Sequence, residues 1–320
     1  MMHEQLQQAF GLAAVDSESL TPWATVLRAR AADGAEAVVK VTATKPERAA
    51  AMAAWTTALA ELGVPVVAPL ALAADNPQRI GDDWWVVYPF IEGRPYEGGA
   101  DDARAAGDLL GRIHAAPVPD AVLRAMRQYE FTDADFDDSH DDLVTLQEEL
   151  PKHLSDDAAP LLAGVQQLLD RWWNTALPAL KAADSDEPLP RAALSSDYRS
   201  TNIVFADDGR LVLVDPDNGG VEPRLFELAM ALVLFHREAA TAPGRMFSDA
   251  EWRAFCEGYS AHVTLTDRER ELWPHAVDHM LWEEGTWAIE DTDADGWANP
   301  RERGYLADLA VVTPERYPLP

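Results

Sequence analysis

Residues Arg191–Asp217 read RAALSSDYRSTNIVFADDGRLVLVDPD, and this stretch decides the fold. It holds two short runs rich in β-branched and large apolar residues, Ile203–Phe205 and Leu211–Val214, which predict two strands. The segment between these runs contains Asp-Gly, a strong signal for a β-hairpin. Polar side chains stand at the outer ends of the two strands: Asp197, Asn202 and Asp215. The stretch therefore predicts a loop, a hairpin and a second loop, with a carboxylate or an amide at each loop end.

Such a set of two carboxylates and one amide suits phosphoryl transfer. One carboxylate orients the attacking hydroxyl and accepts its proton, while the amide and the other carboxylate hold the Mg²⁺ ions that bridge the phosphates of ATP. A polar hairpin with acidic ends is the plainer interpretation of this stretch taken alone.

The D-x-x-x-x-N spacing, followed by strand, turn, strand and aspartate, resembles the catalytic core of the aminoglycoside phosphotransferase superfamily. These small-molecule kinases have the protein-kinase fold, and choline and homoserine kinases are related to them. The resemblance implies that Asp197 is the catalytic base and that Asn202 and Asp215 are metal ligands. Asp217 resembles the extra acid of many small-molecule kinases and joins the metal ligands. The family usually has His-Gly before the catalytic aspartate, whereas this chain has Ser195-Ser196, a change that bears on the rigidity of the loop more than on the chemistry.

Composition limits the class of protein. A chain of 320 residues suits two lobes or one large domain. Its 26 basic and 55 acidic residues give a formal net charge of −29, which argues against nucleic-acid binding. The acidity fits a cationic substrate, a salt-rich cytoplasm or simply an acidic surface. Cys256 is the sole cysteine, so no intrachain disulfide forms and a reducing compartment is expected.

No part of the sequence predicts membrane association. The first ten residues, MMHEQLQQAF, lack the basic and then apolar pattern of a signal peptide. The longest apolar run, Leu225–Phe235, is too short to span a bilayer and is interrupted by Glu227. A cytoplasmic location is therefore expected.

Lys40 is the notable residue of the N-terminal part. Two strands are predicted at Trp23–Arg30 and Ala35–Thr42, and Lys40 is the single charge in Ala37–Val41. A buried ammonium needs a partner. The alternation of the strand leaves open that Lys40 lies on a solvent-facing edge.

The resemblance implies that Lys40 is the kinase strand lysine that binds the ATP phosphates and pairs with a helix glutamate. Glu47, in the first turn of a helix predicted at Pro46–Leu62, is the expected partner, with Glu61 as the runner-up. An acid in a first helical turn also suits the helix dipole alone. No G-x-G-x-x-G motif occurs in this part of the sequence.

The segment Trp84–Phe90 predicts an apolar strand that runs into Ile91. It resembles the hinge of the family, where adenine docks. The resemblance implies that the Pro89 carbonyl and the Ile91 N–H hold the base, since proline keeps its carbonyl. An ordinary core strand is the alternative.

Later segments carry the expected acceptor pocket, in residues 120–182 and 245–320. A helix predicted at Asp101–Ala115 includes His114, which we expect to be a packed structural residue. Helical acids are expected to bind an ammonium group of the substrate or to be merely solvated: Glu283, Glu284 and Glu290.

One motif is separate from the kinase interpretation. The segment from residue 291 to residue 302 matches the calcium-loop pattern D-x-D-x-D-G-x₅-E, which predicts Ca²⁺ binding. A chance match in an acid-rich chain is the alternative. The expected ligands are Asp291, Asp293, Asp295 and Glu302.

These observations predict an α+β, protein-kinase-like fold of two lobes. Residues 1–91 are expected to form a small β-rich ATP-binding lobe, with the hinge at about 88–93, and residues 94–320 a mainly helical catalytic and acceptor-binding lobe. The expected activity is ATP-dependent transfer of the γ-phosphoryl group to a hydroxyl of an aminoglycoside-, amino-sugar- or amino-alcohol-like molecule. A catalytically silent nucleotide-binding module is the alternative. A protein kinase is a third, although the short interval after Asp217 leaves little room for an activation segment.

Overall fold

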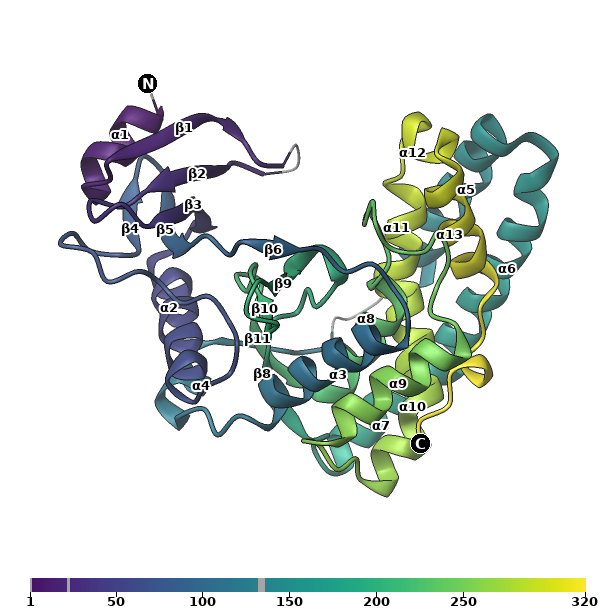
Figure 1. Cartoon of the computed structure of the whole chain (residues 1–320). Coiled ribbons are helices and arrows are strands. Elements are labelled where there is room, and N and C mark those ends of the chain that lie inside the picture. The colour runs from purple at the N-terminus through teal and green to yellow at the C-terminus, as the bar shows by residue number, and fades with distance from the viewer. Residues whose placement is uncertain (1, 22–23, 132–135) are drawn as a thin grey trace. The chain divides into compact units, whose positions relative to one another are not determined.

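The computed structural model describes residues 2–21, 24–131 and 136–320 and contains two compact units (Figure 1). Unit 1 comprises Met1–Arg94, Ala116–Gln128 and Asn202–Val221. Unit 2 comprises Pro95–Ala115, Tyr129–Thr201 and Glu222–Pro320. Unit 1 thus includes two segments that follow the N-terminal part by many residues. The lobe boundary expected from the sequence stays a prediction.

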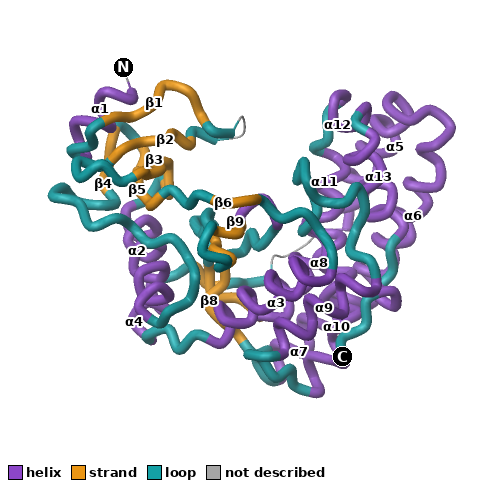
Figure 2. Tube along the Cα trace, in the orientation of Figure 1, coloured by secondary structure: helices purple, strands orange, loops and turns teal. Residues whose placement is uncertain are grey.

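Unit 1 holds most of the strands (Figure 2). Its main sheet has five strands in the order β1-β2-β3-β5-β4, and every neighbouring pair is antiparallel. The strand predicted at Trp23–Arg30 begins outside the described residues. The strands are β1 (Ala14–Ser19), β2 (Val26–Arg30), β3 (Glu36–Ala43), β4 (Gln78–Ile80) and β5 (Asp83–Pro89).

Both faces of this sheet are covered by apolar side chains. On one face, Leu6 and Phe10 of helix α1 (Met2–Phe10) belong to a core cluster that includes Val39 and Val87. On the other face, a second cluster includes Tyr88 and residues from later parts of unit 1. A strand covered on both sides can bury every residue, whatever its alternation.

Helix α2 (Pro46–Glu61) follows β3, and its ends match the sequence signals. Proline stands at its first position, where the missing N–H is no loss. Its last turn is followed by Gly63 with φ of 78°, the left-handed conformation that glycine adopts most readily. A short helix, α4 (Asp120–Ala125), packs against α2 in the same unit.

The hairpin predicted from the sequence is present in unit 1. Strands β9 (Ile203–Ala206) and β10 (Leu211–Leu213) are antiparallel, and β6 (Gly93–Arg94) pairs with β9. After β10, strand β11 (Gly220–Pro223) begins beside β7 (Arg127–Gln128) in parallel register.

Unit 2 is built mainly from helices and contains the short strand β8 (Arg191–Leu194). Helices α3 (Ala100–Ala115) and α9 (Asp249–Ser260) approach closely, because glycine lies at their contact. A Cβ atom on Gly107 would lie 1.9 Å from the Phe255 carbonyl oxygen, and one on Gly258 would lie 2.1 Å from that of Arg104. The remaining helices are α5 (Phe136–Leu154), α6 (Ala158–Arg171), α7 (Leu177–Asp186), α8 (Arg224–Leu234), α10 (Asp267–Met280), α11 (Thr286–Glu290), α12 (Ala294–Ala298) and α13 (Pro300–Val311).

Two of these helical stretches continue through a π-helical turn. Residues Trp172–Ala176 join α6 to α7, and Leu281–Gly285 join α10 to α11. The turns meet through Trp172, whose ring stacks on that of Trp282 at 5.3 Å and whose Nε1 donates to His279 Nδ1 at 3.0 Å. Burial lowers the pKa of His279 to about 4, so its ring is neutral at physiological pH.

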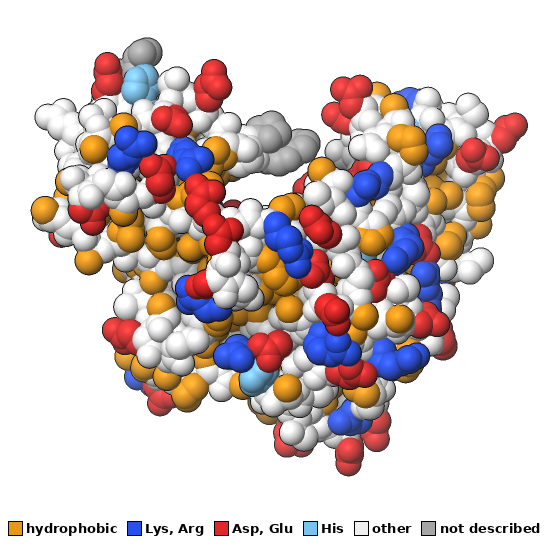
Figure 3. Space-filling model, viewed as in Figure 1, with side chains coloured by type: hydrophobic (Ala, Val, Ile, Leu, Met, Phe, Trp, Pro, Cys, Tyr) orange, Lys and Arg blue, Asp and Glu red, His pale blue; other side chains and the backbone are white. Residues whose placement is uncertain are grey.

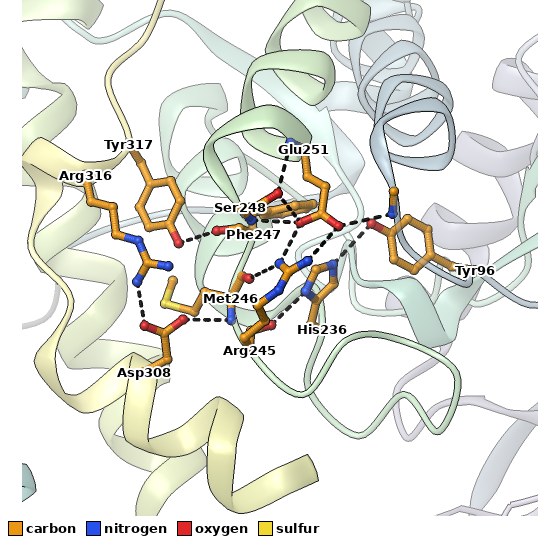
Figure 4. Close-up of polar contacts among 11 residues, drawn as sticks. Tyr96, His236, Arg245, Met246, Phe247, Ser248, Glu251, Asp308, Arg316 and Tyr317 are labelled. Carbon is orange, nitrogen blue, oxygen red and sulfur yellow. Dashed lines mark hydrogen bonds and ion pairs between the residues drawn. The ribbon is translucent and has the colours of Figure 1, made fainter.

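A polar network fixes the segment that follows α8 (Figure 4). His236 Nδ1 donates to the Arg245 carbonyl, and the Tyr96 hydroxyl lies 3.1 Å from His236 Nε2. Arg245 forms a two-pronged ion pair with Glu251, which also caps the start of α9 together with Ser248. These contacts hold the segment that follows α8 in a fixed position. Helix α8 in turn packs against the loop that carries Asp197.

The acidic residues do not form a single patch on the face shown in Figure 3, where Asp and Glu side chains are scattered among Lys, Arg and apolar groups. In the residues that the structure describes, no helix combines the length and the apolar character that crossing a bilayer requires.

Candidate active site

Strands β9 and β10 bring Asn202 and Asp215 to one end of their hairpin. Ile203 pairs with Leu213, and the Val214 N–H donates to the Asn202 carbonyl at 2.8 Å. Asn202 therefore lies opposite Val214, one residue before Asp215. The amide and the carboxylate expected to hold a metal are neighbours within unit 1.

Lys40 lies in the middle of β3, with only 8% of its surface exposed. Its Nζ atom is 2.5 Å from Asp215 Oδ1 and 3.2 Å from Asp217 Oδ2. Burial by itself would lower the pKa of Lys40, but attraction by Asp217 and Asp215 outweighs it and leaves the pKa raised. Lys40 is therefore a charged, buried ammonium between two loop carboxylates.

The buried position settles the question that strand alternation left open for Lys40. Its side chain shares a sheet face with Thr42 and, across the strand pair, with Tyr88. That face is covered by the second apolar cluster, so it is not a solvent-facing edge. The covering residues come from far along the chain, which is why the local pattern of β3 does not reveal the burial.

Glu47, the expected partner of Lys40, does not pair with it. Among the described residues, the carboxylates within ion-pair distance of Lys40 are those of Asp215 and Asp217. Glu47 and the runner-up Glu61 are both exposed on α2. The position of Glu47 in the first turn of the helix is accounted for by the helix dipole.

Asp217 is the most enclosed acid of unit 1, with 7% of its surface exposed. Its Oδ1 accepts hydrogen bonds from the Tyr88 hydroxyl at 2.7 Å and the Thr42 hydroxyl at 2.9 Å. Burial raises the pKa of Asp217, and Lys40 opposes that rise. No feature of the sequence singled out Thr42 or Tyr88, although Thr42 is two residues from Lys40 and Tyr88 directly precedes Pro89.

Pro89 ends β5, and Ile91 follows after one residue. Ladder hydrogen bonds alternate in direction along an antiparallel strand. The Phe90 N–H donates to Glu36 of β3, whereas the backbone of Val87 faces away from β3 and bonds to Leu70 and Asn76. By this alternation, the Pro89 carbonyl also points away from β3. The assignment of the Pro89 carbonyl and the Ile91 N–H to adenine stays a prediction.

The residues of unit 1 fit a magnesium ion of the kind that kinases use. Mg²⁺ is usually held by one or two protein carboxylates, with phosphates and water completing its shell. Asp215, whose side chain is 41% exposed, and the neighbouring Asn202 supply such a set. Asp217 is the poorer candidate, because its Oδ1 already holds two hydroxyl donors. The described residues contain no group of three or more His, Cys, Asp or Glu side chains placed for a metal.

Asp197, the expected base, belongs to unit 2 and follows β8. Its Oδ1 lies 2.8 Å from Arg199 Nε, and Arg199 also reaches Glu238 at 3.3 Å. The loop is held at two further points: the Tyr198 hydroxyl donates to the Ala106 carbonyl at 2.7 Å, and the Ser200 N–H to that of Phe235 at 3.1 Å. The loop that carries Asp197 is thus fixed to the helical core of its unit.

Glu227 supports the position where the family has His-Gly. The buried Glu227 carboxylate accepts from the Ser195 hydroxyl and from the Ser196 N–H, both at 2.6 Å. Its other oxygen lies 2.7 Å from His114 Nε2, and His114 Nδ1 lies 2.9 Å from the Tyr259 hydroxyl. His114 is therefore a buried structural residue, as expected. Sequence reasoning missed Glu227, although its place as the one charge in the apolar run Leu225–Phe235 was a visible signal.

The acids at the end of α10 are partly buried. The π turn contains Glu283 and Glu284, and α11 ends at Glu290. The pKa of Glu284 is raised to about 7, first by burial and then by repulsion from Asp197 and Glu283. Burial and Asp142 likewise raise the pKa values of Glu283 and Glu290. These carboxylates are not ordinary solvated surface acids.

We expect Glu284→Gln to raise the melting temperature at pH 8 and to leave it unchanged at pH 5. Between about pH 4.5 and 7 the folded protein keeps a proton on Glu284 that the unfolded chain has lost, so stability falls as the pH rises. A gap of about 2.5 pH units corresponds to at most about 3 kcal/mol. Thermal melts at both pH values measure it. The exposed Glu148→Gln is the control, and equal effects of the two variants at pH 8 would contradict the assignment.

The calcium motif does not form a calcium loop in the structure. Asp293 caps α12, where its side chain accepts from the Gly296 N–H at 2.8 Å, and Asn299 caps α13. The segment is thus folded into two helix starts, and Asp291, Asp295 and Glu302 are not gathered around a common point with Asp293. Helix capping accounts for Asp293 without a metal. The expectation of calcium binding is not confirmed.

The combination of fold and polar groups defines the class of phosphotransferases. The model of the phosphotransferase enzyme family matches residues 24–272, and the chain belongs to that family. The expected enzyme class, a phosphotransferase of the kinase type, is thereby confirmed. No curated protein is matched by sequence.

Solved structures with a similar fold are kinases and phosphotransferases. A microcompartment-associated aminopropanol kinase is 13% identical, with a TM-score of 0.63 and coverage of 98% of this chain and 96% of that one. An AMP-bound spectinomycin phosphotransferase is 14% identical, with a TM-score of 0.62 and 98% of each chain covered. Choline kinase LicA from Streptococcus pneumoniae is 15% identical, with a TM-score of 0.54 and 97% and 99% covered. The expected α+β, protein-kinase-like fold is confirmed.

Proposed function

We propose that this chain transfers the γ-phosphoryl group of Mg·ATP to a hydroxyl group of a small molecule. The observation that carries the proposal is the buried Lys40 ammonium between Asp215 and Asp217. In such a pair, the buried cation can bind the phosphates and the exposed carboxylate can bind their metal ion. Similar structures support this, since the spectinomycin phosphotransferase was solved with ADP and spectinomycin.

Each residue then has a chemical role. Lys40 binds the phosphates, and the Pro89 carbonyl and Ile91 N–H hold adenine. Asn202 and Asp215 would hold Mg²⁺, which neutralises charge on the phosphates when bound. Residues 1–91 would form the ATP-binding lobe, with the hinge at about 88–93, and residues 94–320 the catalytic and acceptor-binding lobe.

Asp197 acts on the acceptor. Its carboxylate orients the acceptor hydroxyl and takes the proton, while the hydroxyl oxygen bonds to the γ-phosphorus and the bond to ADP breaks. Arg199 keeps Asp197 in place before the acceptor arrives. Glu227 fixes the same loop by accepting hydrogen bonds from Ser195 and Ser196.

The acceptor we propose carries an amino group. Glu283 and Glu284 are half-buried and repel their acidic neighbours, so a cation beside them would relieve that repulsion. Trp287, 62% exposed, follows them by about one helical turn, and an exposed indole ring can bind an ammonium group. This favours aminoglycoside-, amino-sugar- and amino-alcohol-like acceptors over neutral alcohols.

The test is ADP release with Mg·ATP across pools of aminoglycosides, amino sugars, amino alcohols and macrolides. We expect turnover in a pool of amines, and each active amine is compared with its N-acetylated form, which lacks the charge. A loss of about tenfold or more in kcat/KM on acetylation would support the cationic pocket. If no pool gives ADP release but the protein binds ATP, a catalytically silent nucleotide-binding module is favoured. If no pool gives ADP release and the protein does not bind ATP, the proposal is overturned.

A further inference from the structure

Asp215 and Asp217 both face Lys40, but only one of them is free to exchange it for another cation. The Asp215 side chain is 41% exposed, whereas that of Asp217 is 8% exposed. Asp217 Oδ1 accepts two hydroxyl hydrogen bonds, which occupy the two lone pairs of that oxygen. Its Oδ2 is buried, has no hydrogen-bond donor among the described residues and lies 3.2 Å from the lysine Nζ.

The hydroxyl donors are themselves fixed by the sheet. Thr42 stands two residues after Lys40 on the same face of β3, and Tyr88 lies on the neighbouring strand β5. Burial raises the pKa of Tyr88 well above its ordinary range, so its hydroxyl keeps the proton that it donates. Three side chains of one sheet face therefore converge on the Asp217 carboxylate.

Helix α2 does not provide the carboxylate that pairs with Lys40. Glu47 is exposed, and the helix instead sends Arg48 to the backbone carbonyl of Asp217 at 3.4 Å. The helix thus supports the segment that carries Asp217 rather than Lys40 itself.

We propose that Asp217 is the positioning residue that holds Lys40 for the nucleotide phosphates, in place of a helix glutamate, and that it is not a metal ligand. Thr42 and Tyr88 fix the carboxylate so that Oδ2 faces the ammonium. A hydrated Mg²⁺ ion loses its water reluctantly and suits the exposed Asp215 better than an enclosed oxygen. When Asp215 turns to the metal, Asp217 remains as the counter-ion of Lys40. The inference rests on the proposed nucleotide-binding function.

The first experiment measures ATP binding in EDTA and, separately, the Mg²⁺ concentration needed for half-maximal turnover. Asp217→Asn should raise the Kd of metal-free ATP about tenfold and leave the Mg²⁺ midpoint within about twofold. Thr42→Val and Tyr88→Phe should each raise the same Kd about two- to fivefold, which a metal-ligand role does not predict. Asp215→Asn should instead raise the Mg²⁺ midpoint about tenfold. The exposed Asp207→Asn is the matched control.

A second readout needs no nucleotide. The rate of amine modification at Lys40, followed by mass spectrometry, should rise several-fold in Asp217→Asn and stay unchanged in Glu47→Gln. Lys45 and Lys152, both exposed, are internal references within the same sample. If wild type fails to bind ATP but Lys40 responds in this way, the proposed function fails while the Lys40–Asp217 pairing stands.

Two outcomes would overturn the inference. One is an Mg²⁺ midpoint that rises about tenfold in Asp217→Asn with metal-free ATP affinity intact, which would make Asp217 a metal ligand. The other is a rate of amine modification at Lys40 that rises in Glu47→Gln but not in Asp217→Asn. If Asp217→Asn does not fold, the Thr42→Val, Tyr88→Phe double variant decides, and unchanged Lys40 reactivity there would count against the proposal.

Discussion

Asp197→Asn is expected to lower the rate of phosphoryl transfer by about 10²–10⁴-fold, the usual contribution of a positioned general base. Asparagine has the same shape and can still accept a hydrogen bond from Arg199, whose Nη2 donates to Asp197 Oδ2 at 3.4 Å. It cannot take the proton of the acceptor hydroxyl. We therefore expect kcat to fall while the Kd of ATP stays within about threefold, since nucleotide binding is assigned to residues of unit 1.

The control for this variant is Asp207→Asn, which makes the same change at an exposed hairpin position. Its activity should stay within about twofold of wild type, as for most surface changes. ADP release and ATP titration by intrinsic fluorescence measure the two parameters. Retention of more than a tenth of wild-type turnover by Asp197→Asn would show that another group takes the proton.

The elements of this fold were predictable where their signals are local. Pro46 and Gly63 set the ends of α2, and the Asp-Gly turn sets the β9–β10 hairpin. Turns and helix caps depend on a few neighbouring residues, so they can be predicted from the sequence alone. The strand predicted at Trp84–Phe90 likewise differs from β5 by one residue at each end.

The partners of buried charges were harder to predict. Lys40 was identified as a functional candidate, but its partner was sought in the next helix rather than 175 residues away. The face of β3 that carries Lys40 is covered by segments from elsewhere in unit 1. Pairing across such a distance is a property of the tertiary structure, and no local pattern encodes it.

The calcium motif is a local pattern that the described structure does not confirm. Its spacing is correct, but Asp and Asn also begin helices, and in this segment Asp293 and Asn299 do so. An acidic chain supplies such matches readily. The side chains of a calcium motif bind the ion only when the backbone forms a loop that brings them together. Helix capping favours a different backbone conformation.

Glu227→Ala is expected to destabilise the protein by about 3–5 kcal/mol, the usual effect of removing one partner of a buried charged network. The buried Glu227 accepts from Ser195 and Ser196 and contacts His114. Alanine would leave these donors without an acceptor. Glu227→Gln should have a smaller effect, because one amide oxygen still serves the two serines and the amide N–H₂ can face His114 after a change of tautomer.

The two variants separate support of the loop from stability of the fold. Glu227→Gln should lower kcat about tenfold or more at a temperature where it remains folded, with ATP affinity unchanged, because small displacements of a catalytic group are costly. Thermal melts and initial rates measure this, and Glu257→Gln, which breaks a half-exposed ion pair with Arg104, is the control. If Glu227→Gln melts lower but keeps the wild-type kcat, Glu227 stabilises the helical unit without positioning Asp197. A loss of rate with little loss of stability would instead show that this chain rebuilt, with a glutamate and two serines, the support that the family draws from its histidine.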